Sequence, residues 1–522
     1  MKTARYIGSG NAVLGIEIGS TRIKAVLIGE GFEPIASGSY AWENSFENGV
    51  WTYSLHDVRK GMRNCYADLA ADVEKRYGVT ITRLKAVGIS GMMHGYLPFD
   101  ENMNQLCEFR TWRNTTTEKA AKELTELFDF NISLRWSIAH LYHAILCGEP
   151  HVRNIHTITT VAGYVNRLLG GAHAVGICEA SGMFPIEGGG YNRRMLDLFD
   201  NLIADKGYSW KTEDILPKVL AAGESSGILT DEGAAFLDVS GRLKGGAILC
   251  APEGDAATGM AATNSVMPRT GNVSAGTSVF SMVVLEKSLE RVHRELDVIA
   301  SPTGAPTAMV HCNNCTNEIN AWAELFSQVI SMAGTDCPKD RLFELLFTEA
   351  DKGDKDCGGL TAVNYLSGEP VTAAENGCLL FEREIGSSFT IANFMRTQLY
   401  TALAALKYGM DILREENVQI DELFAHGGYF KTEGVGQRIL AAAVNAPVSV
   451  MKTAGEGGAW GIALLAAYTA DSRNLSLGEY LNSVVFSSGE HTTVTPDSDT
   501  VKGFEKYMER YMKAVTNARV KP

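Results

Sequence analysis

Apolar and polar positions along the chain predict an alternation of strands and helices. Residues 13–28 hold two apolar stretches around a polar turn at 19–21, a pattern typical of a β-hairpin. Apolar residues then recur at three-to-four spacing from Val58 to Val73, which predicts a helix. A strand is expected next at 84–89. This alternation favours a mixed or parallel α/β sheet.

The second half of the chain repeats this hairpin pattern. Residues 17–28 read EIGSTRIKAVLI and residues 274–285 read SAGTSVFSMVVL. Aligning Gly19 with Gly276 superposes small hydroxyl residues and then an apolar strand, and about half of the 522-residue chain separates the two glycines. Such an internal repeat predicts two similar domains. We place them at residues 1–245 and 246–480, with a polar segment and a helix at 481–522.

Four further elements are expected downstream of the second hairpin. Residues 391–415 have the apolar spacing of a long helix. An apolar strand at 423–425 leads into His426, Gly427 and Gly428. Two more helices are expected at 435–444 and 458–468.

Composition and charge narrow the possible classes of protein. The chain is 45% apolar and 21% charged, an ordinary globular balance, and its net charge of −14 argues against binding to nucleic acid or to an anionic membrane. No apolar run reaches the roughly 18 residues of a membrane helix. The ten cysteines are scattered without a paired framework, which favours a reducing compartment. We therefore expect a soluble cytoplasmic protein.

Both polar turns could bind phosphate. Gly19-Ser20-Thr21 and Gly276-Thr277-Ser278 each offer backbone N–H groups and hydroxyls, which are the donors that phosphate oxygens accept. Glu17 precedes the first turn and could reach a magnesium ion, and Lys24 follows on the return strand. Each motif alone also fits an ordinary hairpin. Together, facing each other across a cleft, the two turns could clamp a triphosphate.

Asp255 is the candidate general base. It follows a short apolar strand and precedes small residues that begin a helix. A carboxylate there can accept the proton of a hydroxyl that attacks a γ-phosphoryl group. A helix N-cap is the alternative role, and the two are compatible because a helix N-terminus favours the ionised form.

Candidate residues for a sugar lie after the strand at 84–89. His94 follows Met93 there, and Trp112 and Asn114 add a stacking plane and an amide. Each also fits a buried packing role. The glycines that follow His426 could accommodate a nucleotide base, although a glycine pair alone is a weak signal.

Three other motif classes are disfavoured. The stretch HCNNC at 311–315 lacks a second Cys/His pair at zinc spacing, so its cysteines are interpreted as buried packing. Neither a P-loop nor a spaced G-x-G-x-x-G is present, which argues against P-loop NTPases and Rossmann dehydrogenases.

In this order the motifs resemble those of the FGGY family of carbohydrate kinases, and the resemblance runs from about residue 13 to residue 470. The matching elements are the acid, turn and lysine of residues 17–24, Met93-His94-Gly95 as in the xylulokinase branch, Trp112, Ala180-Ser181-Gly182, Gly254-Asp255, Gly276-Thr277-Ser278, Gly427-Gly428 and Gly457-Gly458-Ala459.

The resemblance implies an α/β fold of two actin/hexokinase-like (ribonuclease H-like) ATPase domains with a cleft between them. It implies ATP-dependent phosphorylation of a small sugar, a ketopentose such as xylulose or ribulose, with Asp255 as the general base. Glu17 and Asp255 would bind Mg²⁺, and a homodimer is one expectation. The implied sugar contacts are Met93, His94, Trp112, Asn114 and Asp255, and the implied ATP contacts are Gly19, Ser20, Thr21, Lys24, Gly276, Thr277, Ser278, Gly427 and Gly428.

Two departures from the family pattern leave alternatives open. The family usually has Asp where this chain has Glu17, and often has a sugar-binding Asp where it has Asn114. Gluconate or a polyol therefore remains an alternative substrate. A non-kinase actin-like ATPase that senses sugar is a further alternative, which the combination of Asp255, His94 and Trp112 disfavours.

Overall fold

The computed structural model describes residues 1–451, 457–487 and 491–519. Residues 488–490 and 520–522 of the predicted segment 481–522 thus lie outside the described residues. The chain forms two compact units that are not continuous in sequence. The first unit comprises residues 1–266, 299–306 and 456–488, and the second comprises 267–298, 307–455 and 489–522.

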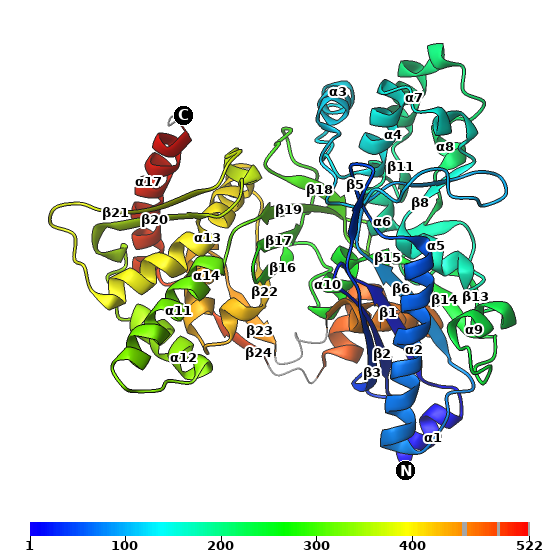
Figure 1. Ribbon diagram of the computed structural model, residues 1–522, viewed down its shortest axis with the longest axis horizontal. Helices are drawn as coiled ribbons and strands as arrows, with labels where there is room; N and C mark the ends of the chain where they lie inside the picture. Colours follow the sequence, from blue (N-terminus) through cyan, green and yellow to red (C-terminus); the bar gives the residue numbers. More distant parts are fainter. Residues whose placement is uncertain (452–456, 488–490, 520–522) are drawn as a thin grey trace. The chain divides into compact units, whose positions relative to one another are not determined.

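A mixed sheet forms the centre of the first unit (Figure 1). The predicted hairpin is confirmed, because its first two strands pair antiparallel around the turn at 19–21. The first strand also pairs in parallel with a strand at residues 86–91. The strand order is β13 (Ser225–Ile228), β14 (Ile248–Cys250), β6 (Ala86–Gly91), β1 (Val13–Ile18), β2 (Arg22–Ile28) and β3 (Pro34–Ala41), with β15 (Glu253–Gly254) also paired to β6.

Helices cover both faces of this sheet. α2 (Leu55–Tyr77) confirms the predicted helix and packs on Gly38 of β3, whose missing side chain lets the backbone of Leu69 approach. α15 (Gly457–Ala470) packs in the same way on Gly15 and Gly88, which point to the opposite face. Further helices of this unit are α1 (Lys2–Gly8), α3 (Glu118–Phe128), α4 (Ser137–Leu146), α5 (Val161–Leu168), α6 (Ile177–Ser181), α7 (Arg193–Leu202), α8 (Thr212–Ile215), α9 (Asp231–Leu237), α10 (Asp255–Ala262) and α16 (Leu477–Tyr480).

The second unit has its own mixed sheet. It contains, in order, β18 (Asp297–Ala300), β19 (Pro306–Cys312), β17 (Val279–Val284), β16 (Thr270–Ala275), β22 (Glu422–His426), β23 (Val448–Met451) and β24 (His491–Val494). A separate hairpin consists of β20 (Leu360–Tyr365) and β21 (Cys378–Arg383). The helices are α11 (Asn317–Met332), α12 (Lys339–Ala350), α13 (Ile391–Glu415), α14 (Val435–Val444) and α17 (Ser498–Arg519).

The two sheets repeat one topology. The order β3-β2-β1-β6-β14-β13 corresponds strand for strand to β19-β17-β16-β22-β23-β24. In each series the first three strands are antiparallel, the next two run parallel to the third, and the last is antiparallel again. Gly19 and Gly276 occupy the same turn of the two series, so the internal repeat seen in the sequence is a structural repeat.

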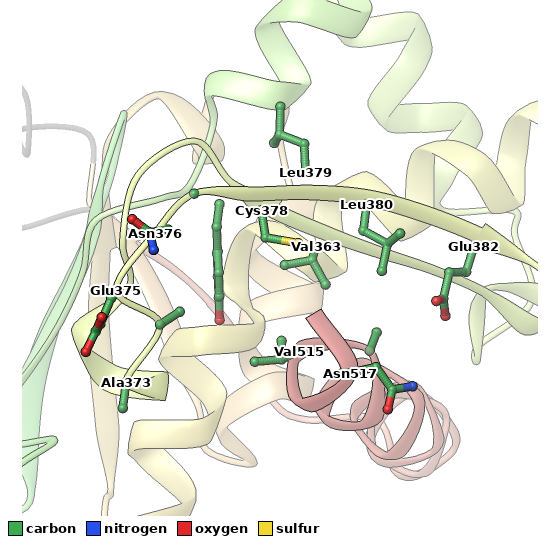
Figure 2. A pocket seen from close by; sticks show the side chains of 14 residues that line it. Val363, Ala373, Glu375, Asn376, Cys378, Leu379, Leu380, Glu382, Val515 and Asn517 are labelled. Carbon is green, nitrogen blue, oxygen red and sulfur yellow. The ribbon is translucent and has the colours of Figure 1, made fainter. Parts of the chain in front are cut away.

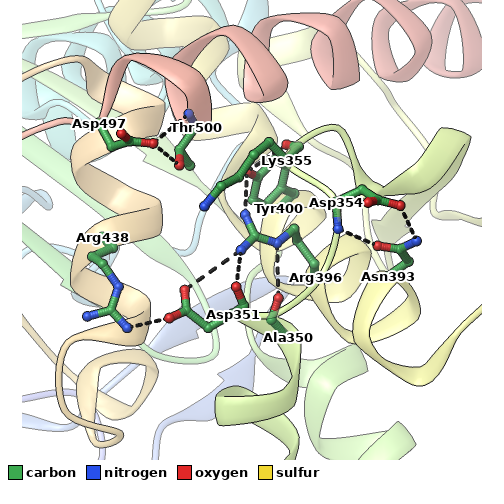
Figure 3. Close-up of polar contacts among 10 residues, drawn as sticks. All are labelled: Ala350, Asp351, Asp354, Lys355, Asn393, Arg396, Tyr400, Arg438, Asp497 and Thr500. Carbon is green, nitrogen blue, oxygen red and sulfur yellow. Dashed lines mark hydrogen bonds and ion pairs between the residues drawn. The ribbon is translucent and has the colours of Figure 1, made fainter.

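A buried arginine joins three helices of the second unit (Figure 3). Arg396 of α13 is only 1% exposed and donates to the carbonyl oxygens of Ala350 at 3.0 Å and Asp351 at 2.9 Å, where α12 ends. It also donates to the hydroxyl of Tyr400 at 3.2 Å. Asp351 in turn pairs with Arg438 of α14 at 2.7 Å. The guanidinium therefore satisfies carbonyls that the helix end leaves without partners and fixes α12 and α14 to α13.

In the described parts of the chain, no helix combines the length and apolarity needed to cross a lipid bilayer.

Candidate functional site

Polar residues of the first unit gather where three parallel strands end. Glu17 of β1 lies opposite Ser90 of β6, and Glu253 of β15 pairs with the same Ser90. Asp255 follows at the first position of α10. Carboxyl ends of parallel strands meet at one edge of a sheet, which is where open α/β folds bind their ligands. The structure thus brings Glu17 and Asp255 together from distant parts of the sequence.

Glu17 is a half-buried residue at this edge of the sheet. Lys24 lies directly across from it on β2, and the backbone N–H of Ala459 donates to it at the start of α15. A Cβ atom on Gly458 would overlap its Oε1 atom, so only glycine lets the helix come this close. Burial raises the pKa of Glu17 to about 7, the charge of Asp255 also raises it, and Lys24 lowers it.

The turn at Gly19-Ser20-Thr21 is held from one side. Each of its three carbonyl oxygens accepts a hydrogen bond. The Gly19 carbonyl accepts from the side-chain Nε1 of Trp42 at 2.8 Å, and the Thr21 carbonyl accepts from the backbone N–H of Trp42 at 3.2 Å. The Ser20 carbonyl accepts from the hydroxyl of Tyr53 at 2.5 Å. The rings of Trp42 and Tyr53 stack with centroids 4.3 Å apart. Since the amide N–H points opposite to the carbonyl of its own peptide, the N–H groups of Ser20 and Thr21 are directed to the other side.

Asp255 is oriented by its neighbours. Its Oδ1 accepts from the backbone N–H of Met93 at 3.3 Å, and the N–H of Ala256 also bonds to it. The side chain of Asp255 is exposed, but the surrounding protein atoms desolvate its carboxyl and raise the pKa, while the positive charge of Arg135 lowers the pKa. A carboxylate fixed in this way is a competent proton acceptor for a hydroxyl placed beside it.

His94 has an unusual backbone. Its φ of 71° lies in the left-handed region, which few residues with a side chain adopt. The side chain is 5% exposed, and its Nδ1 lies 3.3 Å from the carbonyl oxygen of Gly182. Its ring stacks with that of Trp136, with the two ring centroids 6.4 Å apart. Gly182 belongs to the Ala-Ser-Gly element noted in the sequence, so two predicted motifs are in contact.

Trp112 and Asn114 lie on a loop beside the first turn but differ in what they can offer. Trp112 is 37% exposed and its Nε1 donates to Ser20 Oγ at 3.2 Å. Asn114 is buried, and its amide bonds both the N–H and the carbonyl of Trp51, at 2.9 and 2.8 Å. Its side chain therefore holds the loop, and a contact with sugar stays a prediction.

The equivalent turn of the second unit is also anchored through its carbonyls. The carbonyl of Gly276 accepts from the N–H of Thr316 at 3.1 Å and from its hydroxyl at 2.7 Å, and that of Thr277 accepts from the Cys315 N–H at 2.9 Å. Ser278 completes this turn. As in the first unit, the N–H and hydroxyl side is left for a ligand.

The glycine pair predicted to contact the nucleotide, Gly427 and Gly428, lies next to this turn. β16 and β22 run parallel, with Ser274 opposite His426, so both loops follow at the same edge of the sheet. Gly427 has a φ of 111° and packs against the backbone of Ala275. A Cβ on Gly428 would meet no atom within 4 Å, so its backbone is open to a ligand.

Sequence reasoning missed several polar residues around Asp255. Arg135, Glu179 and Glu253 lack the motif spacing that singled out the other candidates. Glu179 and Glu253 are fully buried, and burial raises the pKa of Glu253 to about 8 and that of Glu179 well above its usual range. Glu253 accepts the backbone N–H of Glu179 at 2.9 Å, so it anchors the start of α6 beside the base. The only hint in the sequence was an acid directly before Gly254-Asp255.

The Glu17 and Asp255 side chains fit a magnesium ion. Mg²⁺ prefers hard carboxylate oxygens and is often held by one or two of them together with substrate phosphates. The charge of Asp255 raises the pKa of Glu17, a repulsion that a cation would relieve. Over residues 1–451, 457–487 and 491–519, no group of three or more His, Cys, Asp or Glu side chains gathers in the manner of a protein-only metal site.

A cavity of about 740 Å³ lies elsewhere in the second unit (Figure 2). It opens between the β20–β21 hairpin and the end of α17, with Tyr365, Cys378, Leu380, Val515 and Asn517 on its walls. None of the residues predicted from the sequence lines it.

Comparison with known proteins agrees with this arrangement. Residues 12–242 match the N-terminal domain of the FGGY family of carbohydrate kinases, and residues 271–470 match its C-terminal domain. A xylulose kinase from Haemophilus influenzae is 22% identical over 446 residues, which cover 82% of this chain and 84% of that protein.

Solved structures share the fold over nearly the whole chain. The ligand-bound xylulose kinase from Lactobacillus acidophilus is 14% identical, with a TM-score of 0.78 and coverage of 98% of this chain and 99% of that one. A gluconate kinase from the same organism is 15% identical, with the same TM-score and coverage. Two actin/hexokinase-like ATPase domains are therefore the correct fold class.

Proposed function

Since the chain belongs to the FGGY family of carbohydrate kinases, we propose that it transfers the γ-phosphoryl group of ATP to a hydroxyl of a small ketopentose such as xylulose or ribulose. The observation that carries this proposal is the position of Asp255. Its carboxylate stands at the N-terminus of α10 and is bonded to the backbone of Met93, next to His94. A base and a sugar-binding motif thus share one edge of the sheet.

The residues have separate tasks in the reaction. Asp255 accepts the proton as the sugar hydroxyl attacks the phosphoryl group, and His94 and Trp112 hold the sugar. The N–H groups and hydroxyls of the turns at 19–21 and 276–278 stabilise the negative charge that develops on the transferring group. Bound Mg²⁺, held by Glu17 and Asp255, would add positive charge next to the phosphates.

A substrate panel tests the proposal. Purified protein is incubated with ATP and Mg²⁺, alone or with a ketopentose, a pentitol, glycerol or gluconate, and ADP release is measured. We expect strong stimulation by a ketopentose and none in an Asp255→Asn variant. ADP release that no sugar stimulates would instead support a sugar-sensing ATPase.

A sugar acid is the second candidate substrate. Arg135 lies close enough to Asp255 for its charge to lower the pKa of that carboxyl, so a guanidinium lies near the place where a substrate carboxylate would bind. Stimulation by gluconate, lost in Arg135→Gln, would favour this candidate. Stimulation by a ketopentose that Arg135→Gln retains would exclude it.

Three further features belong to the proposal. We propose that residues 1–245 bind the sugar and residues 246–480 bind the nucleotide, with 481–522 as a C-terminal addition, although residues 246–266 and 457–480 belong to the first compact unit. We also expect a cytoplasmic location, because scattered cysteines suit a reducing compartment. A homodimer is one expectation for the oligomeric state, and light scattering of the purified chain would test it.

A further inference from the structure

A buried acid of the second unit makes an unusual set of contacts. Glu369 is fully buried, and its Oε2 accepts three hydrogen bonds from one short segment. The donors are the N–H of Asn313 at 3.0 Å, the N–H of Asn314 at 3.3 Å and Nδ2 of Asn314 at 3.0 Å. The backbone of Glu369 is itself fixed, because it exchanges two hydrogen bonds with Ala374. A carboxylate that accepts several N–H groups forms strong, charge-assisted bonds.

The same short segment is held on its other side. Oδ1 of Asn314 accepts the N–H groups of Leu366 at 2.9 Å and Ser367 at 3.2 Å. Asn364 donates through Nδ2 to the carbonyl of Cys315 at 3.1 Å. The chain between β19 and α11 therefore cannot shift without breaking bonds to residues 364–369.

This segment in turn fixes the phosphate-binding turn of the second unit. The next two residues, Cys315 and Thr316, supply all three of the hydrogen bonds described above to the carbonyls of Gly276 and Thr277. Hydrogen bonds thus tie Glu369 to Asn314, and the two residues that follow Asn314 in the chain are hydrogen-bonded to the turn at 276–278. The direction of the Gly276 and Thr277 carbonyls decides where the opposite N–H groups point.

We propose that Glu369 is a positioning residue for the phosphates of ATP, a role that rests on the proposed kinase function. The acid does not touch the ligand. It fixes Asn313 and Asn314 so that the next two residues turn the carbonyls of the 276–278 loop away from the phosphate side. A displacement of well under 1 Å in such a loop is enough to weaken a set of convergent donors.

Burial alone does not explain why an acid stands at this position. Transfer of a carboxyl group into the protein interior is unfavourable, and it raises the pKa of Glu369 to about 7. Oε1 is buried and has no hydrogen-bond donor among the described residues. A residue with only a packing role would be replaced by an apolar side chain at no cost to nucleotide binding.

The test compares two buried acids of the second unit. Glu369→Gln keeps the shape but weakens the charge-assisted bonds and places an amide N–H₂ group where Oε1 lacks a partner. Glu416→Gln is the matched control, because Glu416 is also buried and accepts from the N–H of Glu290 at 2.7 Å and from Arg291 at 3.2 Å, in contacts remote from the turn. Calorimetry on the full-length protein measures the Kd of ATP and the Kd of adenosine for each variant, and a thermal melt reports folding.

We expect Glu369→Gln to weaken ATP binding by about tenfold and to leave adenosine binding within about twofold, since adenosine lacks the phosphates. Glu416→Gln should change neither constant. Unchanged ATP binding in folded Glu369→Gln, or equal losses for ATP and adenosine, would overturn the proposal.

A second variant covers the case in which Glu369→Gln does not fold. Asn314→Asp removes the Nδ2 donor and sets a carboxylate against Glu369, while Oδ1 remains as an acceptor. This variant should also bind ATP more weakly while it binds adenosine about as well as the wild type does. An equal loss of affinity for ATP and adenosine would count against the positioning role. Both measurements use nucleotide alone, so a wild-type protein that binds ATP yet phosphorylates no sugar would refute only the proposed function.

Discussion

Asp255 accepts a hydrogen bond at 3.3 Å from the backbone N–H of Met93, which lies 162 residues earlier in the sequence. The contact joins the candidate base to the element that carries His94. The bond uses Oδ1 of Asp255, and the second carboxylate oxygen, Oδ2, takes no part in it. The backbone of the predicted sugar-binding element therefore helps to orient the candidate base.

The first prediction concerns this base. Asp255→Asn retains an oxygen that can accept from Met93 but removes the proton acceptor, so sugar phosphorylation should fall by about 10²–10⁴-fold. The Kd of ATP, measured by calorimetry, should change little. Turnover above about a tenth of the wild-type rate would show that another group is the base.

His94 gives a prediction that separates binding from backbone strain. Its left-handed φ suits asparagine better than alanine, because a short polar side chain tolerates this region. His94→Asn should therefore fold well and raise the KM for sugar by about tenfold or more, with the KM for ATP nearly unchanged. His94→Ala should show the same KM change together with a stability loss of about 1 kcal/mol. Equal rises in both KM values for the Asn variant would place His94 outside the sugar site.

Two glycines of the second unit offer a test of the nucleotide site that leaves the fold intact. A Cβ on Gly276 or on Gly428 would meet no atom within 4 Å. Alanine at either position should therefore leave the melting temperature nearly unchanged. Gly276→Ala should weaken ATP but spare adenosine, because its methyl group approaches the phosphates. Gly428→Ala should weaken the binding of both ATP and adenosine. If instead Gly276→Ala weakens the binding of both ligands and Gly428→Ala weakens only that of ATP, then Gly428 lies at the phosphates and Gly276 does not.

Local patterns of the sequence were sufficient to predict most of the strands and helices that carry the site. The long helix α13 spans Ile391–Glu415 as predicted, and the hairpins around Gly19 and Gly276 are both present. These elements have strong periodicity, and their turns need small polar residues. The sixfold strand correspondence between the sheets extends the repeat well beyond the twelve aligned residues.

Long-range contacts were beyond sequence reasoning. Residues 456–488 return to the first unit, and α15 supplies the backbone N–H that bonds Glu17. Nothing in local periodicity specifies which sheet a late apolar helix covers. Buried acids such as Glu179 and Glu253 were missed for the same reason, since their significance comes from neighbours that are distant in the chain.

Stability should depend on pH through Glu253. Burial raises its pKa from the ordinary 4.5 to about 8, so the folded state binds the proton more tightly than the unfolded state. This contribution to stability is complete below pH 4.5 and is lost as the pH rises through about 8. Glu253→Gln cannot titrate, so its melting temperature should fall less steeply over this window. The slope should not vanish, because burial shifts the pKa of Glu179 in the same direction. The exposed Glu101→Gln serves as the control, and identical slopes for Glu253→Gln and wild type would contradict the prediction.

Glu17 gives the sharpest test of the metal site, because the same carboxyl also bonds the N–H of Ala459 at the start of α15. Glu17→Gln retains an oxygen for that N–H but loses the charge that Mg²⁺ prefers. If Glu17 serves the metal, kcat should fall and should recover in part at high Mg²⁺ concentration. Glu17→Asp keeps the charge and should remain active, although the shorter side chain gives up reach toward Ala459 and some thermal stability. If Glu17 only anchors the helix, the activities of the two variants should rank the other way. Glu17→Gln should then be almost as active as the wild type, and Glu17→Asp should be the less active variant. The dependence of kcat on Mg²⁺ should be the same for the wild type and Glu17→Gln. Titrations of kcat against Mg²⁺ for the three proteins, with a thermal melt of each, therefore distinguish metal binding from helix anchoring.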